Sequence, residues 1–386
     1  MTISTCEQFR DVSVLITGAT GFTGRVLTKK LAAAGAQIRA IARPTSQLGD
    51  LADLNVTWLK GEVFDPETVR RAADGVEYIF HIAAAYRQEN ATEEDYRRVH
   101  VYSTQLLAEV VKDQTKFKRF IHVSTVGVHG HIPGDDLADE TYRFSPGDSY
   151  QRTKLEAEQW LTDFATRSGI PHTVIRPGAI LGPGDERLLK IFKMVQNGFI
   201  LMLGSGKGMY HLIHVEDLTD ILLAAAVSDK ARSQVFIAAN DEPISIIGMG
   251  KVIAKTLQKK IRVIRLPIWP FFLAADLCKV ICTPLGIQPP LYRRRVAFYT
   301  KDRKFNNTKL KQLLGYSFRY SNESGLAETA RWYKQQGWLA GSAAKKQPLR
   351  EIFYCKYITD GLVSSLSRYV EPAIGPASDF VGLSLL

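Results

Sequence analysis

Cysteine is scarce in this sequence. Its 386 residues include four cysteines, which are Cys6, Cys278, Cys282 and Cys355. They are too few and too scattered for the disulfide framework of a small secreted domain. Cys278 and Cys282 could share a helix face, but no histidine or further cysteine completes a metal-binding set. We therefore expect no metal site and a reducing environment.

The N-terminus lacks the apolar core of a signal peptide. The opening residues, "MTISTCEQFRDVSVLI", contain no apolar run of signal-peptide length. We therefore expect a cytoplasmic protein.

The sequence also offers no good membrane-spanning helix. Its most apolar stretch, "LPIWPFFLAADLCKVICTPLGIQPP" at residues 266–290, is interrupted by Asp276, Lys279 and several prolines, which makes it a poor spanning helix. Two interpretations stay open. The stretch lies flat on a membrane with Arg293–Arg295 at the lipid headgroups, or it is a buried helix of a substrate-binding lobe.

Acidic residues are in the minority. Lys and Arg number 50 against 39 Asp and Glu, which gives a formal net charge of +11. This balance favours an anionic partner, either a phosphate-bearing cofactor or an acidic membrane surface; a basic surface without such a partner is the alternative. Nucleic acid is not expected, because no nucleic-acid-binding motif is present and the basic residues are spread along the chain.

Strand and helix patterns alternate from residue 12 to about residue 180. The runs "VSVLITG", "QIRAIAR", "VTWLKG", "VEYIFHIA", "FKRFIHVST" and "HTVIRPG" are typical of strands, and residues 25–34, 66–73, 93–113 and 150–168 of helices. Such alternation predicts an α/β fold with a Rossmann-type, doubly wound parallel sheet. We assign a dinucleotide-binding domain to 12–180, a smaller, interleaved substrate-binding lobe to 181–340, and an extension without a known role to 341–386.

Three glycines follow the first predicted strand. Gly18, Gly21 and Gly24 in "TGATGFTG" stand between that strand and a predicted helix. This context is typical of a dinucleotide-binding loop, where the glycines allow a tight turn, close approach of the pyrophosphate and close helix–strand packing. The amides at the helix N-terminus would bind the phosphates. We include Thr20, Phe22 and Thr23 of the loop in the predicted cofactor site.

The end of the second strand predicts which cofactor is bound. A carboxylate at that position would bind the ribose 2′-hydroxyl and repel a 2′-phosphate. This chain has Ala42 followed by Arg43, with Arg39 nearby, and a guanidinium can bind a phosphate with two hydrogen bonds. The sequence therefore favours NADP(H) over NAD(H), unless Arg43 is only a solvated charge.

A tyrosine and a lysine share one face of a predicted helix. Tyr150 and Lys154 in "SYQRTK" are one helical turn apart, and Ser124 and Thr125 end a predicted strand upstream. With "TGATGFTG", "HVSTVGVHG", "IRPGAILGPGD" and "LIHVEDL", this set resembles the extended short-chain dehydrogenase/reductase family over roughly residues 12–340. The resemblance extends to its epimerase/dehydratase, 3-beta-hydroxysteroid dehydrogenase-like and dihydroflavonol reductase-like branches.

The resemblance implies a role for each of these side chains. Tyr150 would be the general acid/base, Lys154 would lower its pKa and bind the nicotinamide ribose, and Thr125, or its neighbour Ser124, would hold the substrate oxygen. A neighbouring ammonium stabilises a phenolate, which agrees with this assignment. The resemblance further implies cofactor contacts from Glu62, Val63, Ala83, Ala84, Pro177 and Gly178.

One position departs from the family pattern. The family usually has Asn in a segment like "NVxGT", where it keeps a water beside the catalytic lysine, and the matching stretch "HVYST" has His100. Three interpretations stay open, since His100 could replace the asparagine, relay protons or fill space.

The sequence predicts the class of substrate less specifically than it predicts the reaction. Nucleotide-sugar epimerases often have Arg where "YHLIHV" has Tyr210, and losing that cation would weaken diphosphate binding. We therefore expect a secondary alcohol or ketone on an apolar, sterol- or flavonoid-like skeleton. An epimerase or dehydratase is the alternative, with Arg187, Arg293 or Arg295 serving a diphosphate, and a cofactor-binding sensor without turnover is the third. By the same resemblance, helices 93–113 and 150–168 would form a homodimer.

Overall fold

A computed structural model describes residues 7–85, 91–206, 208–282 and 301–339, together with Pro284 and Val296. The predicted extension 341–386 and the residues Arg293–Arg295 lie outside this part. Residues up to Arg265 and from 301 to 339 belong to one compact unit, and the chain from Leu266 begins a second one.

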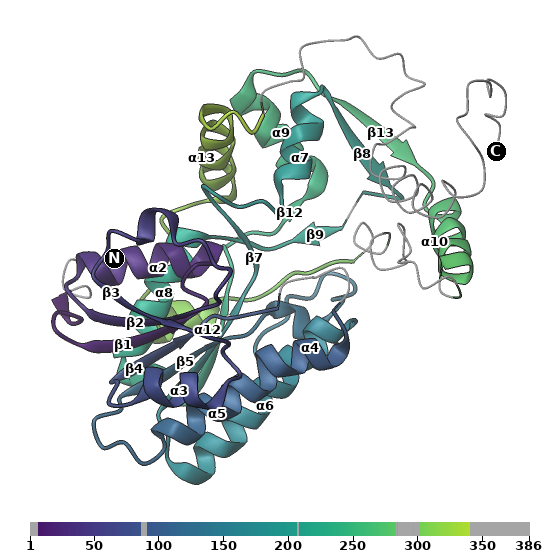
Figure 1. The fold of residues 1–386 in the computed structure, drawn as a ribbon. Helices are drawn as coiled ribbons and strands as arrows, with labels where there is room; N and C mark the ends of the chain where they lie inside the picture. The colour runs from purple at the N-terminus through teal and green to yellow at the C-terminus, as the bar shows by residue number, and fades with distance from the viewer. Residues whose placement is uncertain are drawn as a thin grey trace, which may run out of the picture. The chain divides into compact units, whose positions relative to one another are not determined.

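A seven-stranded parallel sheet forms the centre of the first unit (Figure 1). Its strand order is β11-β6-β5-β4-β1-β2-β3. The strands are β1 (Ser13–Thr17), β2 (Gln37–Ala42), β3 (Val56–Lys60), β4 (Tyr78–His81), β5 (Arg119–Val123), β6 (His172–Pro177) and β11 (Gln234–Ala238). The order reverses between β1 and β4, so ligands are expected at the carboxyl ends of these two strands. The predicted Rossmann-type fold is confirmed.

Helices cover both faces of the sheet (Figure 1). On one face α2 (Phe22–Ala33), α8 (Val215–Val227) and α12 (Thr308–Leu314) pack over Val14 and Ile16 of β1. On the other face α3 (Pro66–Ala73), α5 (Ser103–Val111) and α6 (Ser149–Ser168) pack over Leu15 of the same strand. Because side chains alternate along a strand, the near-continuous apolar run of β1 supplies both cores.

Local signals fix several helix boundaries. Asp65 accepts the backbone N–H of Thr68 and begins α3, and Asp148 accepts that of Gln151 and begins α6. The helical stretch predicted at 93–113 consists of α4 (Glu93–Arg97), a π-helical turn (Arg98–Tyr102) and α5. The π-helical turn inserts an extra residue, a feature that often accompanies functional sites.

Shorter elements follow the sixth strand. The helices are α7 (Leu189–Gln196), α9 (Ile246–Leu257), α10 (Trp269–Cys282) and α13 (Asn322–Gln335). The strands form three pairs: β7 (Ala179–Leu181) with β10 (Leu212–His214), β9 (Met209–Tyr210) with β12 (Ile244–Ser245), and β8 (Phe199–Leu203) with β13 (Arg262–Leu266). None of the described helices has the length and apolarity that crossing a bilayer requires.

Candidate active site

The glycine loop joins β1 to α2 and requires its glycines. Gly18 has φ +73°, a backbone conformation that other residues rarely adopt, and a Cβ there would lie 2.9 Å from the backbone of Ala83. A Cβ on Gly24 would lie 2.0 Å from the carbonyl oxygen of Gly18. The loop therefore packs against both its own helix and the end of β4 with no room for a side chain at either position.

The N-terminus of α2 follows directly after the glycine loop. Its N-cap is Gly21, no side chain caps it, and its first turn carries no acidic residue. These features leave the positive end of the helix dipole available to an anion. The loop geometry and the open helix end together fit a dinucleotide pyrophosphate.

The two predicted phosphate-binding arginines lie in different surroundings. Arg39 donates to the carbonyl oxygens of Ala72 and Asp74 at the end of α3. Arg43, just after β2, is exposed, and its side chain has no partner among the described residues. Of the two, Arg43 is the one whose guanidinium is not held by other residues of the described chain.

Lys154 is buried where two strands end. Its side chain is 1% exposed, and its Nζ donates to the carbonyl oxygens of Val123 at 3.0 Å and Ala83 at 3.4 Å. These carbonyls belong to the ends of β5 and β4, next to the switch point of the sheet. Burial lowers the pKa of Lys154 to about 7, and the carboxylate of Glu158 partly opposes this shift.

Tyr150 stands one turn before Lys154 on α6 and is half-buried. Its ring packs edge-on against the rings of His100, with centroids 5.2 Å apart, and Tyr96, with centroids 6.3 Å apart. His100 in turn accepts the backbone N–H of Ala85, in the loop after β4. These contacts hold the predicted tyrosine and lysine on the face of α6 that meets the ends of β4 and β5.

His100 uses both ring nitrogens for fixed contacts. Its Nε2 accepts the Ala85 N–H at 3.1 Å, and its Nδ1 lies 2.8 Å from Oγ1 of Thr153, which itself donates to the carbonyl of Ser149. Neutral imidazole with the proton on Nδ1 satisfies every member of this chain. Burial lowers the pKa of His100 to about 2. Of the three interpretations, this geometry favours a His100 that fills space, packed against Tyr150, over a proton relay.

The two predicted hydroxyls follow β5. Thr125 Oγ1 accepts the N–H of Gly127 at 3.0 Å, which leaves its own proton for an oxygen acceptor. Ser124 is 2% exposed, and its Oγ has no hydrogen-bond partner within the described chain. The half-buried Thr125 is the better placed of the two to meet a substrate.

The other predicted cofactor residues also follow strand ends. Ala83 and Ala84 come after β4, Glu62 and Val63 after β3, and Pro177 and Gly178 at the end of β6. A Cβ on Gly178 would lie 2.7 Å from the carbonyl oxygen of His211, so this backbone is closely packed. All of these positions lie at the carboxyl edge of the sheet, where a dinucleotide is expected.

Two arginines lie beside residues that the sequence singled out. Arg187 lies over the ring of Phe22 in the glycine loop, 5.2 Å from its centroid, and its Nε is 2.6 Å from the Asp185 carboxylate. Arg303 lies over the ring of Tyr210 at 5.8 Å, and the two residues form a backbone bridge. Sequence reasoning missed Arg303, because its partner is far away in the chain.

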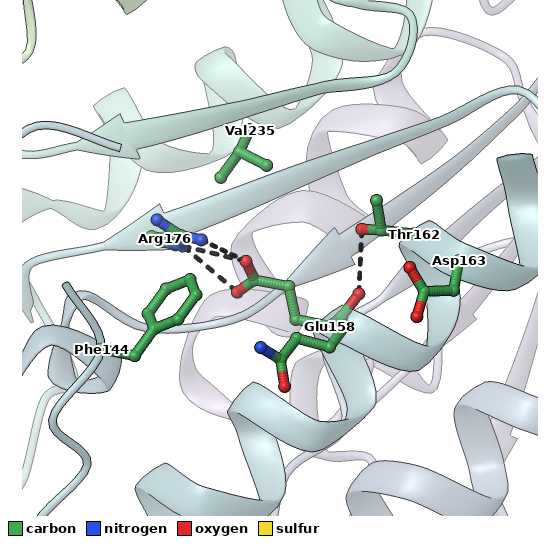
Figure 2. Close-up of a pocket in the computed structure, with 7 residues that line it drawn as sticks. Phe144, Glu158, Thr162, Asp163, Arg176 and Val235 are labelled. Carbon is green, nitrogen blue, oxygen red and sulfur yellow. Dashed lines mark hydrogen bonds and ion pairs between the residues drawn. The ribbon is translucent and has the colours of Figure 1, made fainter. Parts of the chain in front are cut away.

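A separate pocket of about 460 Å³ opens on α6 beyond Lys154. Figure 2 shows Glu158 and Arg176 pointing toward each other there, in a buried ion pair with Nε–oxygen distances of 3.1 and 3.2 Å. Arg176 also donates to the carbonyl of Glu140 and lies over the ring of Phe144. None of the predicted site residues lines this pocket, and its two buried charges, Glu158 and Arg176, satisfy each other, so we assign it a structural role.

Comparisons with known proteins identify the family of this chain. Residues 14–238 match the model of the NAD dependent epimerase/dehydratase family. A 3beta-hydroxysteroid-dehydrogenase/decarboxylase (isoform 2) of Arabidopsis thaliana is 28% identical over 313 residues, which cover 76% of this chain and 54% of that protein. A UDP-glucose 4-epimerase of Vibrio cholerae is 28% identical over 279 residues, which cover 69% of this chain and 82% of that protein.

A solved structure shares the fold along most of both chains. The crystal structure of gox2253 superimposes with a TM-score of 0.71 at 25% identity, covering 85% of this chain and 99% of that one. The family match spans β1 to β11 and includes the glycine loop and the tyrosine–lysine pair. The chain therefore belongs to the NAD dependent epimerase/dehydratase family.

Proposed function

We propose that this protein is an NADP(H)-dependent oxidoreductase. It interconverts a secondary alcohol and a ketone on an apolar, sterol- or flavonoid-like skeleton, with Tyr150 as general acid/base. The observation that carries the proposal is the buried Lys154, whose ammonium lies at the ends of β4 and β5 one turn from Tyr150.

Lys154 supplies the electrostatic part of the mechanism. Its charge lies in a site from which water is excluded, where an ammonium stabilises a nearby phenolate more strongly than in solvent. The carbonyls of Val123 and Ala83 orient Nζ without neutralising it, because neither bears a charge. Lys154 therefore favours the ionised form of Tyr150, as a base that accepts the alcohol proton requires.

Thr125 and Tyr150 act on the same substrate oxygen. The Thr125 hydroxyl donates a hydrogen bond to that oxygen, while the Tyr150 hydroxyl exchanges a proton with it. The nicotinamide, when bound, accepts or supplies the hydride at the substrate carbon. The glycine loop, the amides of α2 and the residues after β3, β4 and β6 hold the cofactor.

The proposed apolar substrate has two supports. Tyr210 occupies a position where nucleotide-sugar epimerases often have arginine, and one relative acts, by its name, on 3beta-hydroxysteroids. A buried aromatic ring suits an apolar skeleton better than a diphosphate, which needs cations. The same proposal includes a cytoplasmic location, which rests on the scarcity of cysteines.

A substrate panel tests the proposed function. Apolar ketones, secondary alcohols and nucleotide sugars are supplied with NADP(H) or NAD(H), and the reduced nicotinamide is followed by its absorbance. We expect stoichiometric oxidation of NADPH with an apolar ketone. Turnover of a nucleotide sugar with no net change in the cofactor would contradict the proposal and favour an epimerase, while binding without turnover of any substrate would favour a sensor.

Arg43 provides the test of cofactor preference. We expect Arg43→Ala to weaken NADP(H) binding by about 10- to 100-fold, because a charge-assisted hydrogen bond contributes about 1.5–3 kcal/mol. NAD(H), which lacks the 2′-phosphate, should bind about as before. Fluorescence titration of the reduced cofactors measures both affinities.

Arg39 offers the matched control. Arg39→Ala should leave the ratio of NADP(H) to NAD(H) affinity unchanged, because its guanidinium is bound to carbonyls at the end of α3. If the wild-type protein binds NAD(H) and not NADP(H), the preference inferred from Arg43 is wrong.

A nucleotide-sugar epimerase or dehydratase is the second candidate. Arg303 lies beside Tyr210, so a cation from another part of the chain occupies the neighbourhood of the missing arginine. A relative is a UDP-glucose 4-epimerase. The substrate panel separates this candidate from the first. The homodimer through helices 93–113 and 150–168 stays a prediction that size determination in solution would test.

A further inference from the structure

Helix α10 exposes an apolar stripe. Five large apolar residues on it, Trp269, Leu273, Leu277, Val280 and Ile281, have between 53% and 69% of their surface exposed. The other exposed large apolar residues in the described chain are Leu137, at 52%, and Phe144, at 41%. Such a concentration on one short helix differs from the isolated exposed apolar residues of most soluble surfaces.

The five residues lie on one side of the helix. At about 100° per residue, they fall within an arc of about 120°. Ala275 on the opposite side is 1% exposed, and Phe271 and Phe272, which lie outside the arc, are half-buried, so the stripe is the outward face of the helix. Asp276 lies at one edge of the stripe, where an interfacial helix keeps polar groups in water.

The length of α10 suits a surface position. Its 14 residues extend about 21 Å, shorter than the hydrocarbon core of a bilayer. Trp269 at its first turn is a residue type enriched at membrane–water interfaces. The helix can therefore lie in the interface and cannot cross it.

Basic residues immediately precede the helix in the chain. Lys259, Lys260, Arg262 and Arg265 are exposed, and the whole chain has a net charge of +11. Lys and Arg side chains near an anionic leaflet are attracted to its surface. An apolar stripe that follows a basic segment in the chain is complementary to acidic headgroups above acyl chains.

We propose that α10 docks this protein on an anionic membrane surface, with its apolar stripe in the headgroup region. Five side chains are few for a protein partner, because a standard interface engages about 20–30 residues on each side. A bilayer needs no shape complementarity, so a single helical stripe suffices. The proposal does not depend on the reaction that the active site performs.

Vesicle flotation of the full chain tests the proposal. Vesicles of phosphatidylcholine mixed with phosphatidylglycerol are compared with vesicles of phosphatidylcholine alone. We expect binding to the anionic vesicles, weakened by salt. The double variant Leu273→Glu/Leu277→Glu should lose about tenfold or more in affinity, a change of about 1.4 kcal/mol, and Arg262→Glu/Arg265→Glu should lose affinity for the anionic vesicles.

Leu137→Glu is the matched control, because it places the same charge at an exposed leucine outside the stripe. It should bind vesicles as the wild type does, and circular dichroism should show each variant folded. The proposal is overturned if the wild type binds no anionic vesicle, or if Leu273→Glu/Leu277→Glu binds as well as the wild type. A stripe that mediates self-association without vesicle binding, released in the double variant, would also overturn it.

Discussion

Replacing Tyr150 by Phe is expected to lower kcat by about 10²- to 10⁴-fold on any ketone or alcohol that the protein turns over, the range typical for loss of a general acid/base. The phenyl ring keeps its edge-on contacts with His100 and Tyr96, so the fold of α6 and the position of Lys154 should persist. Cofactor affinity should change little, because the phenolic hydroxyl acts on the substrate. Steady-state kinetics and cofactor titration on the same preparation measure both quantities.

Tyr96→Phe is the control for Tyr150→Phe. It removes a hydroxyl from the same aromatic group, and we place no catalytic role on Tyr96, so turnover should stay near that of the wild type. A Tyr150→Phe variant that keeps wild-type turnover would contradict the assignment of Tyr150. A variant that instead loses cofactor binding would show that Tyr150 supports the site and does not transfer the proton.

Local patterns predicted the elements of the sheet well. The strands β1 to β6 lie within the apolar, β-branched runs, and α3 runs from Pro66 to Ala73 as predicted, because Asp65 gives a clear N-cap signal. The start of α2 at Phe22 was predicted three residues late, since its N-cap Gly21 makes no side-chain hydrogen bond. The π-helical turn at Arg98–Tyr102 was missed because one inserted residue hardly disturbs the apolar periodicity.

Long-range contacts of the site were less predictable. The spacing of Tyr150 and Lys154 is local, so the sequence showed that they share a helix face. The contacts of Lys154 with Val123 and Ala83 depend on β4 and β5 lying side by side, which only the folded sheet determines. The contact of Arg303 with Tyr210 could not be predicted either, because the two residues are 93 positions apart in the sequence.

Burial of the lysine should also leave a signature in stability. The pKa of Lys154 is about 7 in the folded protein, against an ordinary value of 10.5. Between these values the unfolded chain binds a proton that the folded chain does not, so stability rises with pH across this window. Each unit of pKa shift corresponds to about 1.4 kcal/mol. Across the whole window the free energy of unfolding therefore changes by about 5 kcal/mol.

Lys154→Met removes this titration while filling the same space. Relative to the wild type, the variant should gain stability as pH falls from about 10.5 to about 7, although loss of the hydrogen bonds to Val123 and Ala83 offsets part of the gain. Urea unfolding of both proteins without cofactor across this pH range measures the difference in stability. The same variant should also lose turnover.

Lys251→Met, at an exposed position on α9, is the control, and its stability relative to the wild type should not vary with pH in this way. A difference between Lys154→Met and the wild type that does not vary with pH would contradict the lowered pKa of Lys154 and would mean that its amine is solvated or paired in solution.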